Sequence, residues 1–270
     1  MVVALITGAS SGIGRELARE LATRSYDLVL VARRGDALKA LAGDLAGKYG
    51  VRTWPIEQDL SEPGGAAALA EKVRGLGLEI GVLVNNAGAG IYGPLNELED
   101  GDIARIITLN YITPILLTKR LLPDLIKARG CVVNVVSLAA HIPIPWFGIY
   151  TSTKAALANF TDALRIELRP LGVRVIGVYP GYVRTSFHEN TIASPTASRA
   201  RGSPSTMVLD PAFVARAIAE KIADQRFNGD ITPGLAYSIA GALARPLYPL
   251  VRRYLDGWFK RTRGSLISRR

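Results

Sequence analysis

The chain has 270 residues and a formal net charge of +10, from 33 Lys and Arg against 23 Asp and Glu. This length fits one large α/β domain or two small ones, and an apolar fraction of 49% excludes general disorder. The stretch from Arg252 to Arg270 alone contributes +6 of the charge. A nucleic-acid-binding protein is expected to carry a basic stripe through its body, so this distribution argues against that function.

Cysteine and histidine are scarce in this sequence. Cys131 is the only cysteine, which excludes an intramolecular disulfide and a cysteine-based zinc cluster, and two histidines argue against a His-rich metal site. The first apolar run, residues 2–6, has neither the basic flank nor the cleavage site of a signal peptide. No apolar run of the body is long enough to span a bilayer. We therefore expect a cytoplasmic protein with no metal site.

Short β-branched runs alternate with longer stretches of helical periodicity along the chain. The runs are continuously apolar, which is typical of strands buried on both faces in a parallel sheet. The expected strands are 2–6, 27–31, 52–56, 81–85, 131–136 and 173–178, with a short one near 230–232. The expected helices are 12–24, 36–49, 62–76, 102–129, 149–168 and 211–223.

Alternation of strand and helix predicts an α/β fold with one doubly wound, mostly parallel, seven-stranded sheet. No internal repeat or linker divides the chain, so we expect one catalytic domain over residues 1–232. Residues 233–270 are expected to form a C-terminal helical extension, first apolar and then basic, and not an independent domain.

Residues 186–207 differ from the rest of this domain. They are rich in Ser, Thr, Ala, Pro, Arg and Gly and show little periodicity. A segment of that length without a clear pattern is usually functional or mobile in a compact domain, so we expect a lid over the substrate. The alternative is an ordinary surface excursion.

A glycine-rich turn follows the first strand and opens the first helix. The stretch Thr7–Gly14 spaces its glycines as G-x-x-x-G-x-G. Glycines let the backbone approach a pyrophosphate, and the start of the helix offers free N–H groups and a positive dipole end. The strand before and the helix after it favour a dinucleotide site over a chance match.

The second strand ends in Arg33 and Arg34, where an NAD-specific site would place a carboxylate on the ribose hydroxyl. A guanidinium can bind a 2′-phosphate in bidentate fashion, whereas a carboxylate would repel it. We therefore predict NADP(H) over NAD(H). The alternative is that both arginines are solvated charges at a helix start.

Polar and small residues follow the next two strands. Asp59 and Leu60 come after the third strand, and Asn85–Gly88 after the fourth. Open α/β sheets bind ligands at the carboxyl ends of their strands, so both groups are expected at the cofactor. The small residues leave room for a flat adenine and ribose.

Four residues suggest proton-transfer chemistry. Tyr150 and Lys154 lie one helical turn apart, Ser137 closes the fifth strand, and Asn110 precedes that strand. A neighbouring ammonium is expected to lower the pKa of a tyrosine, which can then exchange a proton with a carbonyl–alcohol pair. Taken singly, each residue also has an ordinary structural explanation.

Together these motifs resemble the classical short-chain dehydrogenase/reductase family, over roughly the first 185 residues, including Pro180-Gly181 and Thr185. The resemblance implies a Rossmann fold and a catalytic tetrad of Asn110, Ser137, Tyr150 and Lys154. It also implies that Asp59 contacts adenine, that Asn86 supports the central strand and that Thr185 contacts the nicotinamide amide. The predicted cofactor-binding residues are Gly8, Ser10, Ser11, Gly12, Ile13, Gly14, Arg33, Arg34, Asp59, Leu60, Asn86, Ala87, Gly88, Tyr150, Lys154, Pro180, Gly181, Val183 and Thr185.

The implied reaction is reduction of a ketone or aldehyde with NADPH, Tyr150 giving the proton and Ser137 orienting the oxygen. Residues 143–147 are mostly apolar, which favours a ketoacyl, steroid-like or aromatic carbonyl compound. The predicted substrate-contacting residues are Ser137, His141, Phe147, Tyr150 and Tyr182. An NADP-dependent alcohol dehydrogenase running in the oxidative direction is the first alternative, and a dinucleotide-binding sensor or scaffold without turnover is the second.

Partners are suggested by the family and by the end of the chain. By resemblance, a homodimer or homotetramer is expected to pair through the helices at 102–129 and 149–168. Residues 233–270 combine an apolar segment with basic and aromatic residues, which suits peripheral contact with an anionic membrane. The alternative is that 233–251 covers the substrate cavity or a subunit interface and that the basic end is disordered.

Overall fold

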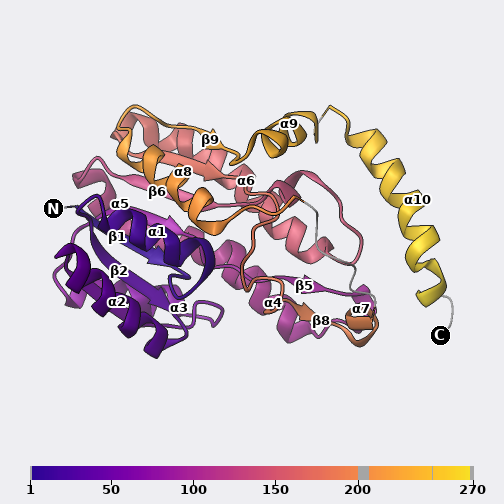
Figure 1. Cartoon of the computed structure of the whole chain (residues 1–270), viewed down its shortest axis with the longest axis horizontal. Helices are drawn as coiled ribbons and strands as arrows, with labels where there is room; N and C mark the ends of the chain where they lie inside the picture. The colour runs from indigo at the N-terminus through magenta and orange to yellow at the C-terminus, as the bar shows by residue number, and fades with distance from the viewer. Residues whose placement is uncertain (1, 200–206, 245, 268–270) are drawn as a thin grey trace.

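A seven-stranded parallel sheet lies at the centre of the molecule (Figure 1), in a computed structural model that describes residues 2–199, 207–244 and 246–267. The expected parallel sheet is confirmed: the five central strands are buried along their whole length, as a sheet covered on both faces requires, and only the two edge strands are partly exposed. The strand order is β3-β2-β1-β4-β6-β7-β9. The strands are β1 (Val3–Thr7), β2 (Asp27–Ala32), β3 (Thr53–Glu57), β4 (Ile80–Asn85), β6 (Cys131–Val135), β7 (Arg174–Val178) and β9 (Asp230–Ile231).

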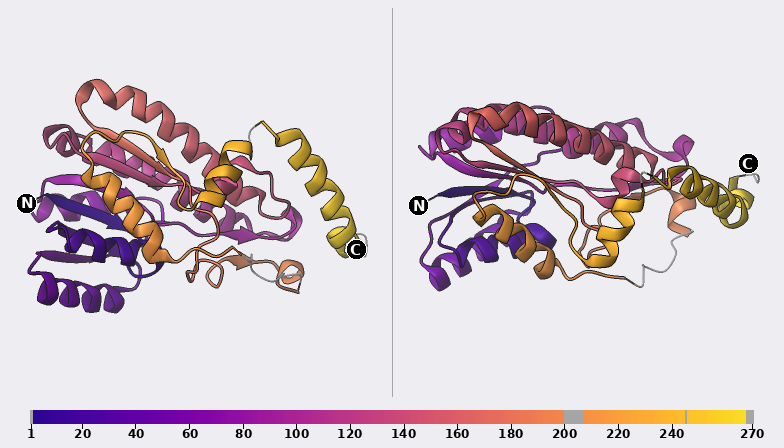
Figure 2. Two further views of the ribbon diagram at one scale, coloured as in Figure 1. Left: turned by 45° about the horizontal axis from the view of Figure 1, so that its top comes forward. Right: turned by 90° about the horizontal axis from the view of Figure 1, so that it is seen from above.

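Helices cover both faces of the sheet, as the edge-on view in Figure 2 shows. One face is covered by α1 (Gly12–Ala22), α2 (Gly35–Tyr49) and α8 (Pro211–Ala223). The other is covered by α3 (Gly65–Gly75), α5 (Thr113–Lys127) and α6 (Gly148–Leu168). Successive side chains of a strand point to opposite faces, so the central strands β1, β2, β4, β6 and β7 contribute to both cores.

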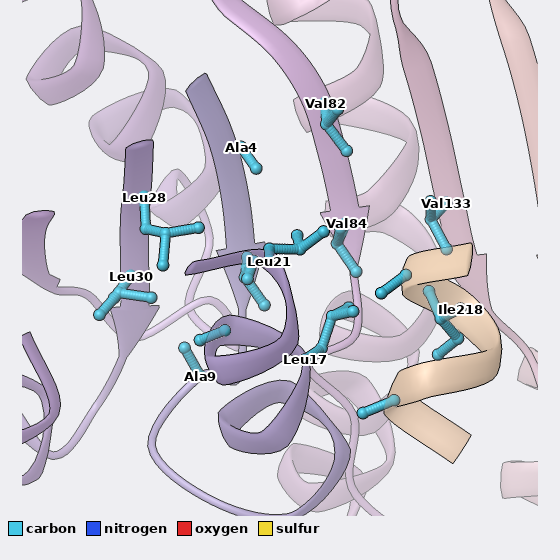
Figure 3. Close-up of a cluster of buried hydrophobic side chains, with 14 of the residues drawn as sticks. Ala4, Ala9, Leu17, Leu21, Leu28, Leu30, Val82, Val84, Val133 and Ile218 are labelled. Carbon is cyan, nitrogen blue, oxygen red and sulfur yellow. The ribbon is translucent and has the colours of Figure 1, made fainter. Parts of the chain in front are cut away.

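The core between the sheet and helices α1 and α8 is shown in Figure 3. Leu17 and Leu21 of α1 are fully buried against alternate residues of the strands, including Ala4 and Val84, and Ile218 of α8 closes the same cluster. Burying a leucine side chain contributes roughly 1.5–3 kcal/mol. This packing holds the start of α1 against the end of β1, where the glycine-rich turn lies.

The direction of the strand order reverses next to β1. The chain passes outward from β1 through β2 to β3, and then returns to place β4 on the other side of β1. Loops that leave the carboxyl ends of β1 and β4 therefore diverge, which opens a crevice of the kind where doubly wound sheets bind ligands.

The expected helix over 102–129 is divided in the structure. It consists of α4 (Asp100–Ile107), a π-helical turn over Thr108–Ile112 and α5. Asn110 lies in the π turn, and its side chain bonds the main chain of Ala89 on a separate loop. Single π turns within helices are frequent at functional sites, and no hydrophobic periodicity distinguishes one from an α-helical turn.

The segment expected as a lid over 186–207 contains more regular structure than its composition indicated. The strand β8 (Ile192–Ala193) pairs in parallel with β5 (Ile91–Tyr92) and is followed by α7 (Pro195–Arg199). Strands of two residues carry no readable alternation, so this second sheet was not predicted. Residues 200–206 of the expected lid lie outside the described residues.

Beyond β9 the chain forms α9 (Leu235–Ala244) and α10 (Tyr248–Ile267). Helix α9 packs on the short 3₁₀ turn η3 (Leu138–His141), whereas α10 extends away from the sheet at the far side of the molecule (Figure 1). The Phe259 ring of α10 lies 5.5 Å from the Trp146 ring. Within the described part of the chain, no helix is both long and apolar enough to cross a membrane. Residues 245 and 268–270 of the expected extension lie outside the described residues.

Candidate active site

A cavity of about 650 Å³ lies at the carboxyl ends of the central strands. Its lining comes from the glycine-rich turn, the ends of β2, β4 and β6, helix α6, and the loop after β7. The structure thus brings together most of the residues predicted from the sequence. Those that line the cavity are Gly8, Ser10, Ser11, Gly12, Ile13, Arg33, Arg34, Asp59, Leu60, Asn86, Ala87, Gly88, Ser137, Phe147, Tyr150, Lys154, Pro180, Gly181, Tyr182, Val183 and Thr185.

Three of the predicted residues, Gly14, Asn110 and His141, are not in the cavity lining. Gly14 packs against the Gly8 carbonyl and the Asn86 side chain so closely that a Cβ would collide with both. Asn110 is fully buried behind the lining. The His141 ring is stacked on the Tyr179 ring, 5.3 Å between centroids. The first two support the lining from behind, and the substrate role of His141 stays a prediction.

The glycine-rich turn has the geometry of an anion cradle. Gly8 and Gly12 have φ of +69° and +55°, in the left-handed region that favours glycine, and a Cβ on Gly12 would lie 2.8 Å from the Thr185 side chain. Ser11 caps α1 without bonding its N–H groups through its side chain. Those first N–H groups of the helix are therefore available to a phosphate.

A hydrogen-bond network joins the turn to the end of β4. Thr7 Oγ1 accepts hydrogen bonds from the N–H groups of Asn86 and Ala87, both at 3.0 Å. Asn86 Nδ2 donates to the carbonyl oxygens of Thr7 at 2.8 Å and Gly8 at 3.3 Å. These bonds hold the floor of the cavity rigid between β1 and β4.

Two exposed arginines and one carboxylate flank the end of β2. Arg34 Nη2 donates to Ser10 Oγ at 3.2 Å, which places its guanidinium beside the turn. Burial alone would raise the pKa of Asp59, but hydrogen bonds from Ser61 and the charges of Arg33 and Arg105 lower it below its usual value. Asp59 is therefore ionised at neutral pH and available to accept hydrogen bonds.

These features fit a dinucleotide cofactor. Gly8 and Gly12, whose φ is positive, leave space that the Cβ of any other residue would fill. The free N–H groups at the start of α1 suit the pyrophosphate of a dinucleotide. Exposed Arg33 and Arg34 at the end of β2 suit a further phosphate, and ionised Asp59 suits a donor such as an adenine amine.

At the other end of the cavity, α6 presents Tyr150 and Lys154 from one face. Both side chains are buried, at 7% and 4% exposure. The Tyr150 hydroxyl is hydrogen-bonded to the Ser137 side chain. Lys154 Nζ lies 6.0 Å from the Tyr150 ring centre and donates to the Val135 carbonyl at 2.9 Å.

The expectation that Lys154 lowers the pKa of Tyr150 is wrong: the pKa is raised, and burial is the main cause. Burial raises the pKa of Tyr150 to about 12, against the opposing hydrogen bond from Ser137. Burial also lowers the pKa of Lys154 to about 8, because the same desolvation penalises its charge. Tyr150 is thus protonated at neutral pH and suited to donate a proton.

Asn110 holds the loop beside these two residues. Its Oδ1 accepts from Ala89 N–H at 3.0 Å, and its Nδ2 donates to the Ala89 carbonyl at 2.9 Å and to Thr153 Oγ1 at 3.2 Å. A Cβ on Gly88 would lie 3.2 Å from Asn110 Oδ1 and 3.5 Å from Lys154 Nζ. The side-chain amide of Asn110 is therefore engaged with protein, and its place in a proton relay stays a prediction.

Aromatic and aliphatic side chains surround the Tyr150 ring. Phe147 is stacked on it at 4.4 Å and Phe187 lies at 5.4 Å. The Tyr182 ring is stacked on His188 at 4.2 Å. Leu138, Ile142 and Ile144 add further apolar surface to the lining.

Sequence reasoning did not single out two lining residues from α9, Tyr237 and Ala240. They belong to the apolar stretch for which covering the cavity was the alternative interpretation. The helical spacing of small residues at Ala240, Gly241 and Ala244 could have indicated a face packed against another surface. Which surface it covers depends on the path of the chain after β9.

Comparison with known proteins places this site in a family context. The family described as short chain dehydrogenase matches residues 2–195. "Dehydrogenase/reductase SDR family member 7B" of Mus musculus is 33% identical over 71% of this chain, and the match spans 61% of that protein. "Very-long-chain 3-oxoacyl-CoA reductase" of Bos taurus is 31% identical over 93% of this chain and 78% of its own length. "NADP-dependent 3-hydroxy acid dehydrogenase" of Schizosaccharomyces pombe is 37% identical over 68% of this chain and 72% of its own length.

Solved structures agree with these sequence relatives. A short-chain dehydrogenase from Sphingobium yanoikuyae in complex with NADPH matches 100% of this chain and 96% of its own, with a TM-score of 0.79 and 30% identity. L-sorbose reductase from Gluconobacter frateurii, complexed with NADPH and L-sorbose, matches 86% of this chain and 94% of its own, with a TM-score of 0.74 and 27% identity. On the family match, the relatives and the fold, this chain belongs to the short-chain dehydrogenase/reductase family.

Proposed function

We propose that this protein reduces the ketone or aldehyde of an apolar substrate to the alcohol with NADPH, using Tyr150 as the proton donor. The observation that carries the proposal is the buried Tyr150, bonded to Ser137 and protonated at neutral pH, in the cavity that the glycine-rich turn also lines. Relatives whose names include 3-oxoacyl-CoA reductase and NADP-dependent 3-hydroxy acid dehydrogenase support it.

Each residue has a defined task in this reaction. The nicotinamide cofactor, when bound, supplies the hydride. Ser137 hydrogen-bonds the substrate oxygen and holds it beside the Tyr150 hydroxyl, which transfers its proton to that oxygen. The Lys154 ammonium then stabilises the phenolate left on Tyr150, since an adjacent positive charge favours the ionised form. Phe147 and Phe187 exclude water from the Tyr150 ring.

A panel of ketones and aldehydes, followed by the loss of NADPH absorbance, tests this function. We expect turnover of apolar ketones and weak or no turnover of charged ones, because Leu138, Ile142, Ile144 and Phe147 of the lining are all apolar. The alternative of an alcohol dehydrogenase uses the same residues in reverse, with Tyr150 as the proton acceptor, and would show as formation of NADPH from NADP⁺ and an apolar alcohol. A sensor or scaffold without turnover would bind NADPH and consume none.

We infer that the protein assembles as a homodimer or homotetramer through the helices α4, α5 and α6. Ile166 of α6 is 76% exposed and Ile112, before α5, is 40% exposed, so both are available to a second subunit. Light scattering should give two or four chains, and Ile166→Asp should lower that number. Lys39→Asp in α2 on the opposite side of the sheet is the control, and a monomeric wild-type protein would contradict the inference.

We also propose that the region 233–270 contacts an anionic membrane from one side. Leu243 of α9, Leu247 between the helices, and Leu250 and Tyr254 of α10 are exposed, close in sequence to the exposed bases Arg252 and Arg253. Apolar groups beside basic ones favour the interface of anionic lipids. A cytoplasmic location stays a prediction.

Vesicle co-sedimentation measures this contact. Full-length protein should sediment with phosphatidylserine-containing vesicles more than with phosphatidylcholine vesicles, because each Lys or Arg near an anionic surface contributes about 1 kcal/mol. Protein ending at Val251 lacks α10 beyond its first turn and should lose the difference. Equal sedimentation of the two chains would remove the membrane contact and favour the covering role of 233–251.

A further inference from the structure

Helix α9 has an apolar side chain on almost every side. Its outer ridge is Leu235, Ile239 and Leu243, at 80%, 53% and 46% exposure. Its inner face places Tyr237 and Ala240 in the cavity lining and Gly241 against Leu138. A helix that is hydrophobic all round normally has apolar neighbours all round, so the two faces of α9 require separate explanations.

The inner face borders the substrate side of the cavity. In 138–147 and 235–244, both fully described, no side chain that lines the cavity is charged. Leu138 directly follows Ser137 in the chain, and the ring of Tyr237 lies over Gly181 so closely that any Cβ there would collide with it. Helix α9 therefore flanks the place where the substrate carbonyl would lie, beside Ser137.

The volume of the cavity is small for a dinucleotide cofactor and a substrate together. Its volume of about 650 Å³ includes both the cofactor side and the substrate side. Cavities of roughly 300–1,000 Å³ enclose a single drug-sized ligand, and a dinucleotide is larger than such a ligand. Little enclosed volume remains for a substrate, so any long apolar part must leave the cavity.

Small residues of α9 mark the place where the apolar part of a substrate can leave the cavity. Ala240 lines the cavity and is exposed as well, so it lies where the cavity lining meets the outer surface of α9. At the next position a Cβ on Gly241 would lie 2.9 Å from Leu138 Cδ2, which shows how closely the helix approaches η3. Tyr237 is held at one side of this opening, because its hydroxyl donates to the Met207 carbonyl.

We propose that α9 forms the exit for the apolar tail of an elongated substrate, with Ala240 as the residue that determines how long a tail is accepted. The inference rests on the proposed carbonyl reduction and selects among its substrates: a slender ketoacyl-like chain fits this opening better than a rigid fused-ring ketone. The tail leaves the cavity beside Ala240, next to the contact of Gly241 with Leu138, and then lies on the exposed apolar surface of α9.

A chain-length series tests the role of Ala240. Methyl ketones from butanone through octanone to dodecanone are compared by kcat/KM with the full-length protein and NADPH. Ala240→Phe narrows the opening, so the ratio of kcat/KM for dodecanone to that for butanone should fall at least about tenfold, the equivalent of two buried methylene groups. Ala240→Leu should give an intermediate ratio.

Ala242→Phe is the matched control, since Ala242 is exposed on α9 but does not line the cavity. It should leave the ratio at the wild-type value, and melting temperatures check that all variants are folded. An unchanged ratio in Ala240→Phe, or an equal fall in Ala242→Phe, would overturn the inference.

Binding measurements with the same ketones distinguish a failure of the proposed exit at α9 from a failure of the proposed carbonyl reduction. If the wild-type protein reduces none of them, the proposed reduction fails. The thermal shift that each ketone produces in the NADPH-saturated protein still compares tail lengths in the wild type and the two phenylalanine variants. A loss of the dodecanone shift in Ala240→Phe alone supports the exit, and equal shifts in all three proteins refute it.

Discussion

Replacing Tyr150 with Phe should lower kcat for ketone reduction by about a hundred- to ten-thousandfold, the usual contribution of a positioned general acid. The change removes only the hydroxyl that is bonded to Ser137 and leaves the ring stacked on Phe147 at 4.4 Å. NADPH affinity, measured by fluorescence titration, should stay close to the wild-type value because the cofactor-binding turn is untouched. Near-normal turnover would exclude Tyr150 as the proton donor.

Tyr92→Phe is the matched control for this variant. The Tyr92 ring packs edge-on against the same Phe147 ring at 5.9 Å, but Tyr92 does not line the cavity. Loss of its hydroxyl should leave kcat unchanged. A comparable fall in both variants would mean that packing around Phe147, and not proton donation by Tyr150, determines the rate.

The pH dependence of the wild-type protein gives a second measurement on the same group. A proton donor must be protonated, and Tyr150 with a pKa of about 12 stays so across neutral pH. Lys154, with a pKa of about 8, loses its charge as the pH rises above that value and then no longer stabilises the phenolate. Reduction should therefore be level at neutral pH and fall under alkaline conditions, and Tyr150→Phe should abolish that dependence.

Removing the charges of Arg33 and Arg34 together should raise KM for NADPH by about a hundredfold or more. Each hydrogen bond to a charged group contributes about 1.5–3 kcal/mol, and both guanidiniums are exposed in the cavity lining at the end of β2. KM for NADH should change little in Arg33→Ala/Arg34→Ala, because a ribose hydroxyl carries no charge to pair. The ratio of kcat/KM for the two cofactors is the measurement.

Arg74→Ala provides the control for lost charge. Arg74 is exposed on α3 and pairs with Glu71 away from the cavity, so the cofactor ratio should stay at the wild-type value. A clear preference of the wild-type protein for NADH would contradict the assignment. In that case Arg33 and Arg34 are solvated surface charges, and the bond from Arg34 to Ser10 serves only to order the turn.

The local sequence was informative wherever one short stretch had to satisfy a strong physical requirement. Apolar runs such as the one in 27–31 are favourable only when both faces are buried, so they predicted strands of a covered parallel sheet. The glycine-rich turn was recognisable because Gly8 and Gly12 need left-handed φ. Tyr150 and Lys154 were recognisable because helical spacing places them on one face.

Three features of the site could not be found in this way. The π turn at Asn110 depends on bonds to Ala89, twenty-one positions earlier in the chain. The pairing of β5 with β8 joins two-residue strands from distant segments. The pKa of Tyr150 was predicted in the wrong direction, because the sequence showed its neighbour Lys154 but not how deeply both side chains are buried.

The sequence by itself determined the class of fold, because local patterns of burial specify strands and helices, and its motifs showed the resemblance to the family that the comparisons confirm. It also selected Ser137, Tyr150 and Lys154 as candidates, and the structure brings them together in one cavity. Only the tertiary structure decided that α9 lines the cavity through Tyr237 and Ala240 and that α10 touches Trp146 through Phe259. Contacts between distant segments depend on the path of the whole chain in space. Burial at such contacts changes the pKa values of Tyr150 and Lys154. Among the described residues, the basic side chains Arg252, Arg253, Lys260 and Arg261 are not part of the cavity lining.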